Sequence, residues 1–325
     1  MMHTAKYMHQ ILDLAIPAYD EIFDEVDMSG LVEKTGVDTE KLEHTIMGTV
    51  VHDAHTPNVA RESTLASGLP VHVPAHTVSL ACISSNMAAT QIADMIRLGH
   101  ISCGIAAGVE TLSDPPIRLS PAFRKTLVRW QKVKSPGTLM SELQHVKNLQ
   151  LSDLSLDVPS VKEFSNGKSM GEGAEILAQR AGIAREQSDE FAERSHILAS
   201  RALKEGLFKE NIVSVQTPPS FKTISEDDGP RADTTLEKLA KLRPAFDKTF
   251  GVNTAGNSSF LTDGASAMLM MSAAEAKAQS YKPKAYFKDY LYKAGDALTE
   301  MLLGPALTIP LLLERNHLKV EDIGV

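Results

Sequence analysis

The sequence predicts an α/β fold in which helices cover a sheet, and three features of its 325 residues point to that class. Apolar residues make up 43% of the chain and aromatic residues only 5%, so small and aliphatic side chains must fill most of the core. That mixture suits packed α/β layers better than an all-β sandwich. Strand-like and helix-like runs alternate over residues 44–110, and the same pattern of runs returns at residues 251–272 after a long polar interval. We therefore expect one layered core that is interrupted by an insertion.

The individual elements are predicted from hydrophobic periodicity and from glycine stops. Short β-branched or small apolar runs predict strands, whereas apolar positions spaced three and four residues apart predict helices. In the first part of the chain, strands are predicted at 44–51, 76–84 and 102–110, and helices at 7–26, 62–69 and 86–99. Later helices are predicted at 170–183, 185–206 and 304–318, and a strand at 282–290. The last residues, VEDIGV, resemble the start of another strand.

Changes in composition predict three domains. The polar interval begins near Asp114-Pro115-Pro116 and is mostly helical or irregular until about Asp247. Because the α/β pattern of the core domain resumes after it, this interval is interpreted as an insertion and not as a linker. The predicted limits are 1–113 with 248–280 for the core domain, 114–247 for the inserted domain, and 281–325 for the start of a further domain.

Charge and cysteine content argue against several classes of protein. The net charge of −8 disfavours a generic nucleic-acid binder, so an anionic ligand needs a local basic patch. Two cysteines cannot form a disulfide framework, and they suit a reducing compartment. No apolar run approaches the roughly 20 residues that span a bilayer. The N-terminal MMHTAKYMHQ lacks the features of a signal peptide or of a clear transit peptide.

Cys82 is the best candidate for a reacting residue. It lies between an apolar strand and a helix that begins near Ser85. The unpaired N–H groups and the dipole of a helix N-terminus favour thiolate over thiol, and a thiolate is the nucleophile that covalent acyl transfer requires. A buried structural cysteine is the competing interpretation, and position alone leaves the two about even. Cys103 lies within an apolar strand without such a turn, so we favour a structural role there.

Two segments have the composition of binding surfaces. Residues 252–267 are dense in Gly, Asn, Ser and Asp, which allow close approach to an amide-rich ligand, although an ordinary turn is the alternative. Residues 117–149 interleave basic and apolar side chains. That pattern suits an anionic membrane surface, a phosphate or a partner, whereas a solvated helix face is at least as common.

Charged residues on the predicted helix at 185–206 are assigned no chemistry. His196 is interpreted as structural or solvent-facing, and Asp189, Glu190, Glu193 and Arg194 as surface charges. The sequence contains no GxGxxG motif, no P-loop and no metal-ligand spacing. Nucleotide-phosphate and metal motifs therefore add no candidate site.

Segments along most of the chain resemble the thiolase family, and within it the β-subunits of the fatty-acid oxidation trifunctional complex. They are PNVARE (57–62), HTVSLACIS (76–84), AAGVETLSD (106–114), EFSNGKSMGEGAE (163–175), SDEFAERSHILASRA (188–202), LEKLAKLRPAFDK (236–248), NTAGNSSFLTDGASAM (253–268) and MLLGPALTIPLLLE (301–314). The cysteine segment together with the GNSS…DGA segment is highly specific. The resemblance implies a layered αβαβα core with an inserted helical loop domain and a truncated second half.

The resemblance also implies an activity and a site. In this family, the cysteine at the position of Cys82 attacks the keto carbon of a 3-ketoacyl-CoA, acetyl-CoA leaves, and a second CoA collects the acyl group. The positions of Met170, Ala255 and Ser259 lie along the pantetheine arm, and that of Arg231 lies near the nucleotide end. CoA would thus be a substrate, with no permanently bound cofactor and no metal.

Partners and location follow from the same resemblance. We expect a homodimer that binds acyl-CoA and CoA, with the α-subunit of the trifunctional complex as a further partner. Peripheral membrane contact is expected through residues 117–149, and no nucleic acid is expected. The family implies a mitochondrial location, with the cytoplasm as the alternative.

The sequence also departs from the family pattern. Lys238 stands where some relatives carry a CoA-contacting serine, and Ala184 replaces a serine that caps a helix. The His-Glu-Ala-Phe-type, Gly-His-Pro and Cys-x-Gly-Gly segments, which supply the base, the acid–base cysteine and much of the oxyanion stabilisation, do not occur up to Val325. Two functions therefore stay open: a 3-ketoacyl-CoA thiolase whose sequence continues further, or a non-catalytic thiolase-like subunit that binds acyl-CoA. A ketoacyl synthase shares the fold and the nucleophile but fits the GNSS…DGA segment less well.

Overall fold

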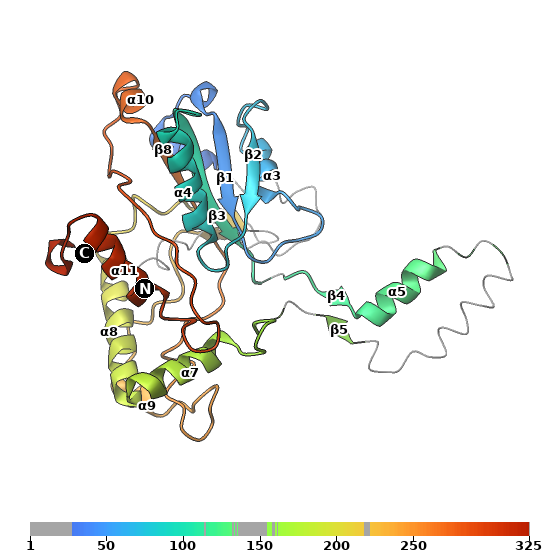
Figure 1. Ribbon diagram of the computed structural model, residues 1–325, viewed down its shortest axis with the longest axis vertical. Helices are drawn as coiled ribbons and strands as arrows, with labels where there is room; N and C mark the ends of the chain where they lie inside the picture. Colours follow the sequence, from blue (N-terminus) through green and yellow to red (C-terminus); the bar gives the residue numbers. More distant parts are fainter. Residues whose placement is uncertain are drawn as a thin grey trace.

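The computed structural model describes residues 28–324 apart from 114, 132, 134, 136–154, 158–159, 161 and 218–221. At its centre is a four-stranded sheet in the order β2-β1-β3-β8 (Figure 1). The strands are β1 (His44–Gly48), β2 (Ala75–Val78), β3 (Cys103–Glu110) and β8 (Gly264–Met271). β1 runs parallel to β2 and β3, whereas β8 is antiparallel to β3. The three strands predicted up to residue 110 thus share one sheet, although β2 is shorter than expected. The helix predicted at 7–26 lies outside the described residues.

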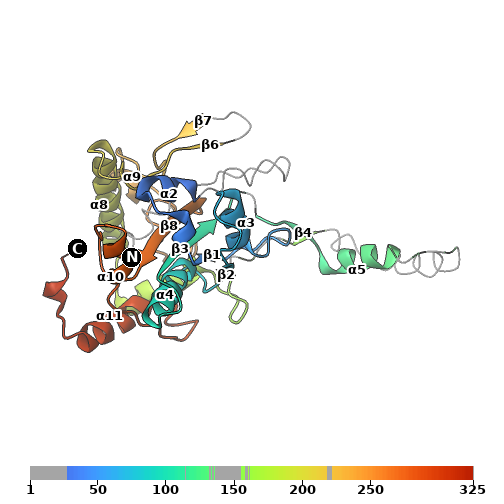
Figure 2. The ribbon, with the colours of Figure 1, turned by 90° about the horizontal axis from the view of Figure 1, so that it is seen from above.

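Helices cover both faces of this sheet, because alternate side chains of each strand point to opposite faces. Met47 and Ile105 pack towards α2 (Ser29–Thr35) and α3 (Val59–Ala66), whereas Ile46 and Ala106 pack towards α4 (Ser84–Arg97). Figure 2 shows α2 and α3 on one side of the sheet and α4 on the other. We call this unit, residues 28–110 with 264–278, the sheet lobe.

A second group of helices lies beside the sheet and forms what we call the helical lobe, residues 162–217 with 222–263 (Figure 1). Its helices are α7 (Met170–Ala181), α8 (Arg185–Lys204) and α9 (Leu236–Ala240), and its strands β6 (Val215–Thr217) and β7 (Lys222–Ile224) form a small hairpin. A capping box fixes the start of α7, where Ser169 and Glu172 accept each other's backbone N–H groups. As expected, Ala184 has no side chain to cap α8, and its own N–H instead donates to Gln187 at 2.9 Å.

A narrow arm projects from the two lobes (Figure 1). It consists of β4 (Arg118–Leu119), α5 (Pro121–Trp130) and β5 (Leu156–Asp157), and β4 pairs with β5. Ser120 caps α5, and Pro121 occupies the first helical position, where a missing N–H costs nothing. The basic segment predicted at 117–149 is described here only in part, because residues 136–149 lie outside the described residues.

The C-terminal part differs from expectation at two places. The strand predicted at 282–290 is wrong: this segment is extended but pairs with no strand in the described structure. Its residues instead bind α4, since the Tyr290 hydroxyl donates to the Asp94 carboxylate and the Arg97 guanidinium donates to the Lys288 carbonyl at 2.6 Å. β-branched and aromatic content favours extended backbone, but only a neighbouring strand makes a ladder. The last residues form a 3₁₀ helix (Val320–Asp322) and not a strand, after α10 (Ala273–Ala278) and α11 (Gly304–Arg315).

Within the described residues, no helix has both the length and the apolar character needed to cross a membrane.

Candidate active site

Cys82 lies in a tight turn between the end of β2 and the start of α4. Ala81, directly before it, has a φ of 45°, which places a non-glycine residue in the left-handed region. The buried Ser84 hydroxyl holds this turn by accepting the Leu80 N–H at 2.8 Å and donating to the Ala81 carbonyl at 2.6 Å. Such strain persists only where neighbouring contacts determine the backbone. The turn leaves Cys82 exposed to solvent at the N-terminus of α4.

Two paired glycines allow α4 to start directly on the sheet. Gly48 of β1 lies opposite Gly108 of β3. A β-carbon at position 48 would lie 2.3 Å from the Ser84 carbonyl carbon, and one at position 108 would lie 2.6 Å from Ser85 Cβ. Any side chain at either position would therefore push the first turn of α4, and Cys82 with it, away from the sheet.

Cys103 has a different environment from Cys82. It is fully buried inside β3, and burial, with the carboxylates of Glu275 and Glu43, raises the pKa of its thiol to about 12. Its thiol therefore stays protonated at neutral pH, and a protonated thiol is a poor nucleophile. The two cysteines thus separate into an exposed residue at a helix start and an inert residue of the core.

A buried carboxylate on α7 holds the first part of the loop 251–263. The Glu175 side chain is 5% exposed and accepts the N–H groups of Val252 at 2.9 Å and Asn253 at 3.1 Å. A β-carbon at Gly251 would lie 2.7 Å from Glu175 Oε1, so glycine is needed for this approach. The loop is therefore fixed by charge-assisted hydrogen bonds from a helix 77 residues away in sequence.

A second buried network holds the rest of the same loop. Asp189 is 3% exposed and lies between Arg185 Nε, at 2.8 Å, and Asn257 Nδ2, also at 2.8 Å. Asn257 Nδ2 donates in addition to the Val252 carbonyl at 2.9 Å, and Asn257 Oδ1 accepts the Thr254 N–H at 2.7 Å. The interpretation of Asp189 as a surface charge is wrong, because tertiary packing places it beneath this loop.

A pocket of about 520 Å³ lies between α8, α9, the segment 227–234 and this loop. Three residues that the resemblance associates with CoA, Arg231, Ala255 and Ser259, line the same pocket. Its floor is apolar, since Gly256 leaves room for Leu239 and Leu242, both within 2.5 Å of where its β-carbon would lie. The other lining residues are Glu110, Ala192, Ser195, His196, Ala199, Asp227, Gly229, Pro230, Asp233, Thr234, Lys238, Ser258, Phe260, Thr262, Asp263 and Gly264.

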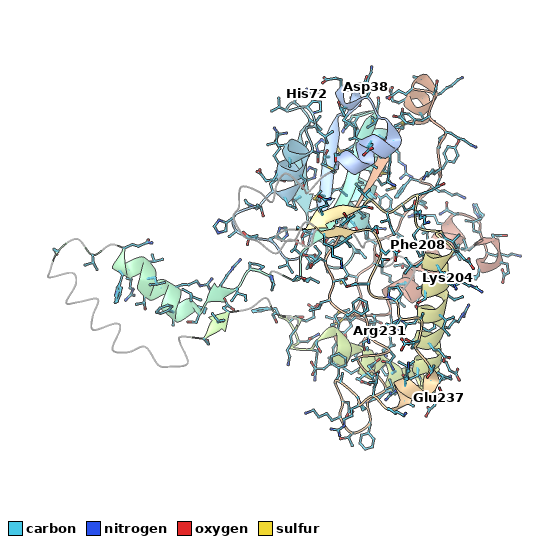
Figure 3. The ribbon with its side chains drawn as sticks, turned by 180° about the vertical axis from the view of Figure 1, so that it is seen from behind. Asp38, His72, Lys204, Phe208, Arg231 and Glu237 are labelled. Atoms are coloured by element: carbon cyan, nitrogen blue, oxygen red, sulfur yellow. The ribbon has the colours of Figure 1, made fainter. Side chains whose placement is uncertain are left out.

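The cationic residues of the pocket have defined partners. The backbone N–H of Arg231 donates to His196 Nδ1 at 3.2 Å, which fixes the segment that carries the guanidinium. Figure 3 shows Arg231 in the helical lobe, far from Asp38 and His72 at the opposite end of the sheet. Lys238 Nζ lies 2.6 Å from Asp233 Oδ2, and this pair lowers the pKa of the Asp233 carboxyl below its usual range. His196, interpreted from the sequence as structural or solvent-facing, accepts the Arg231 N–H and lines the pocket.

Cys82 and Met170 do not line this pocket in the described structure. Met170 is the first residue of α7 and is 42% exposed. Sheet topology nevertheless brings the Cys82 turn and the pocket to one edge, because the parallel strands β1, β2 and β3 all end there. Glu110, which lines the pocket, ends β3, and its carboxylate accepts the N–H groups of Val50 and Val51 just after β1. The pocket and the Cys82 turn therefore lie at the same end of the sheet.

Comparison with known proteins identifies the fold family. Residues 19–274 match the family described as "Thiolase, N-terminal domain". The chain belongs to the thiolase family. It is 47% identical over 299 residues to a probable 3-ketoacyl-CoA thiolase of Caenorhabditis elegans, covering 92% of this chain and 66% of that protein. It is 43% identical over 298 residues to the mitochondrial trifunctional enzyme subunit beta of Bos taurus, covering 92% of this chain and 62% of that protein.

Solved structures agree with this assignment. A crystal structure of the Bacillus anthracis acetyl-CoA acetyltransferase matches with a TM-score of 0.78 and 31% identity, covering 92% of this chain and 71% of that one. The predicted thiolase-like α/β fold is therefore confirmed. This thiolase chain spans less than two thirds of the length of the two curated relatives named above.

Residues that shape the site of this thiolase chain include several that sequence reasoning missed. Glu175 and Asn257 lie inside segments already quoted for the resemblance, but their roles depend on partners far along the chain. Arg185 could not be predicted from the sequence either, because its ion pair with Asp189 has the same spacing as any exposed pair of charges four residues apart on a helix. Phe260 directly follows the predicted contact Ser259, and its aromatic character next to a small-residue loop was an available signal.

Among the described residues, no group of three or more His, Cys, Asp or Glu side chains could hold a metal ion.

Proposed function

We propose that this thiolase chain carries the nucleophile and the CoA-binding pocket of a 3-ketoacyl-CoA thiolase of fatty-acid β-oxidation. The observation that supports it most is the placement of an exposed cysteine and an amphiphilic pocket at one edge of the sheet. In the reaction, 3-ketoacyl-CoA and CoA give acetyl-CoA and an acyl-CoA that is two carbons shorter. The names of the related proteins support the same activity.

The pocket has the features that CoA requires of its binding site. Its volume of about 520 Å³ lies within the range of small-molecule sites. The apolar floor formed by Leu239 and Leu242 suits the alkyl parts of the pantetheine arm, and Ser259 suits its amides. Arg231 and Lys238 are the cations that line it and suit phosphate groups. We assign Ala255, Ser259 and Met170 to the pantetheine arm and Arg231 to the nucleotide end.

The role of Cys82 is nucleophilic. Its sulfur attacks the keto carbon of the bound 3-ketoacyl-CoA, the bond between the α-carbon and that keto carbon breaks, and the acyl group stays on sulfur as a thioester. The α-carbon takes up a proton, and acetyl-CoA leaves. A second CoA thiol then attacks the thioester, so that acyl-CoA leaves and the thiol is restored.

The test is to detect the acyl-thioester on the purified chain. The protein is incubated with a 3-ketoacyl-CoA, quenched in acid and examined by intact-mass and peptide mass spectrometry. We expect an acyl adduct on Cys82 that disappears in Cys82→Ser and persists in Cys103→Ser. Calorimetry with CoA runs in parallel, and Arg231→Ala should weaken binding by roughly tenfold, as expected for a lost charged contact of about 1.4 kcal/mol.

Three outcomes separate the candidate functions. An adduct on Cys82 supports the thiolase activity. Tight CoA binding without any adduct supports the alternative function, a non-catalytic thiolase-like subunit that binds acyl-CoA. A chain that neither binds CoA nor forms the adduct overturns the proposal.

We further propose a homodimer in mitochondria that binds the α-subunit of a trifunctional complex. The name of the bovine relative supports both the partner and the location. Contact with an anionic membrane through residues 117–149 is proposed on the basis of α5, which carries exposed Lys125 and Arg129 beside Val128, 53% exposed, and Trp130, 45% exposed. Co-sedimentation with vesicles that contain anionic lipid tests it, and equal binding of Lys125→Glu/Arg129→Glu would contradict it.

A further inference from the structure

One wall of the pocket is a phenylalanine ring placed on a glycine. Phe260 and Gly229 both line the pocket, and they come from segments 31 residues apart. A β-carbon at Gly229 would lie 2.3 Å from Phe260 Cζ and 3.0 Å from Cε2. That distance is shorter than any real carbon–carbon contact, so the ring occupies the space that a side chain at 229 would need. Gly229 does not have a positive φ, and space alone therefore explains the glycine.

The ring contacts Gly229 through its edge and stays partly open to solvent. Phe260 is 50% exposed although its edge contacts the backbone of Gly229. A half-exposed aromatic ring at a pocket wall offers a flat apolar surface at little cost in conformational entropy. Phe250, also in the helical lobe, is 79% exposed but does not line the pocket. The two phenylalanines therefore differ in position relative to the pocket and provide a matched comparison.

The segment that holds the ring also carries the cation of the pocket. Arg231 follows Gly229 by two residues, and its N–H is bound to His196 of α8. Ser259 directly precedes Phe260 in the loop that is held by Asn257 and Asp189. The Phe260 ring, Arg231 and Ser259 thus all line the same pocket. A ligand that contacts both Arg231 and Ser259 occupies the pocket that the ring lines.

We propose that Phe260 is a specificity-determining residue for CoA and that Gly229 is required to seat its ring. The CoA chain packs against the open face of the ring, and the glycine fixes the position of that face. This inference rests on the proposed CoA-binding function of the pocket. Its distinctive consequence is that substitutions at positions 229 and 260 have non-additive effects on CoA affinity, although a glycine and a phenylalanine side chain form no ion pair and no hydrogen bond.

The test is a double-mutant cycle read by calorimetric titration of CoA into the purified chain. We expect Phe260→Ala to weaken CoA binding about tenfold, in the range measured for aromatic contacts. Gly229→Ala should weaken it by a similar factor, because the new methyl group displaces the ring. In the Phe260→Ala background, Gly229→Ala should add less than about twofold, since no ring remains to be displaced. Phe250→Ala should leave CoA affinity unchanged, and circular dichroism checks that each variant is folded.

An exchange of the two residues gives a second, independent test. The variant Gly229→Phe/Phe260→Gly places the ring in the same space from the opposite wall, and it should bind CoA better than Phe260→Ala. Phe260→Ala binding within about twofold of wild type, full additivity of the two single changes, or an exchange no better than Phe260→Ala would each overturn the proposal. If the unmodified chain does not bind CoA at all, the CoA assignment itself fails. If wild type and every variant bind CoA with equal affinity, the role of Phe260 is excluded, but the assignment of the pocket to CoA stands.

Discussion

The sheet lobe and the helical lobe are stabilised in different ways. In the sheet lobe, the largest fully buried side chains are aliphatic, and Leu42, Ile46, Ile92 and Ile105 are examples. In the helical lobe, the buried apolar residues are three alanines with Phe208 and Leu239, and two buried carboxylates bind the loop 251–263. The sheet lobe therefore depends mainly on the burial of apolar area, whereas the helical lobe depends on paired polar groups. In the helical lobe the interactions that stabilise the fold also shape the pocket.

The largest effect is expected from Asp189→Ala. The change leaves Arg185 as a poorly solvated cation, 19% exposed at its side chain, and leaves Asn257 without its carboxylate acceptor. Breaking a buried pair in this way costs about 3–5 kcal/mol. We expect hydrogen exchange of the Val252, Asn253 and Thr254 amides to accelerate and CoA binding to fall. The milder Asp189→Asn change keeps an acceptor for one partner and should cost less.

Ile105→Ala is the matched control from the sheet lobe. It removes a fully buried aliphatic side chain, and such truncations cost about 2–5 kcal/mol. Because Ile105 has no polar role, exchange of the loop amides and CoA affinity should stay close to wild type under native conditions. Equal acceleration of the loop amides by both variants would contradict the separation of the two lobes.

A smaller effect is expected from Ser84→Ala at the Cys82 turn. The substitution leaves the Leu80 N–H without its acceptor and removes the bond to the Ala81 carbonyl. An unsatisfied buried group of this kind costs about 1–3 kcal/mol. We expect faster exchange of the Leu80 amide and a changed rate of Cys82 alkylation by iodoacetamide. Ser85→Ala is the control, because it keeps the β-carbon that contacts Gly108. An alkylation rate of Cys82 that changes in Ser84→Ala but not in Ser85→Ala would locate the effect in the turn.

The smallest effect is a pH dependence confined to the sheet lobe. Burial, and secondarily the neighbouring His76, lower the pKa of His44, whose Nε2 lies 3.0 Å from His76 Nδ1. As the pH falls through about 6.5, His44 takes up a proton in the unfolded chain before it does in the folded chain. The contribution of neutral His44 to the stability of the fold is therefore complete above that pH. It is lost as pH falls from about 6.5 through the lower folded pKa.

Urea denaturation between pH 7.5 and pH 5 measures this dependence. The wild-type midpoint should fall as the pH decreases, and the fall should be smaller in His44→Gln. The Asp233 carboxyl of the helical lobe, whose pKa is lowered by Lys238, stays ionised over this range and should add nothing. An identical pH dependence in wild type and His44→Gln would exclude His44 as its origin.

Local features of the chain were predictable because they depend on neighbours in sequence. The strand at 102–110 and the helices at 86–99, 170–183 and 185–206 are present to within a few residues, with Gly99 and Gly182 at positive φ where helices stop. The position of Cys82 at a helix start follows from the same local signals. The strand at 282–290 failed, because a strand needs a pairing partner that local sequence does not reveal.

By itself, therefore, the sequence determined where most helices and the central strand at 102–110 lie, where several helices end, and that Cys82 precedes a helix. Only the tertiary structure decided what surrounds the pocket. Asp189 and Asn257 are 68 residues apart, and the Val252 amide is 77 residues from the carboxylate that it binds. The fit of Phe260 on Gly229 depends on the distance between two backbones. Local propensity does not determine such distances, because they are set by how segments far apart in the sequence pack together within the helical lobe.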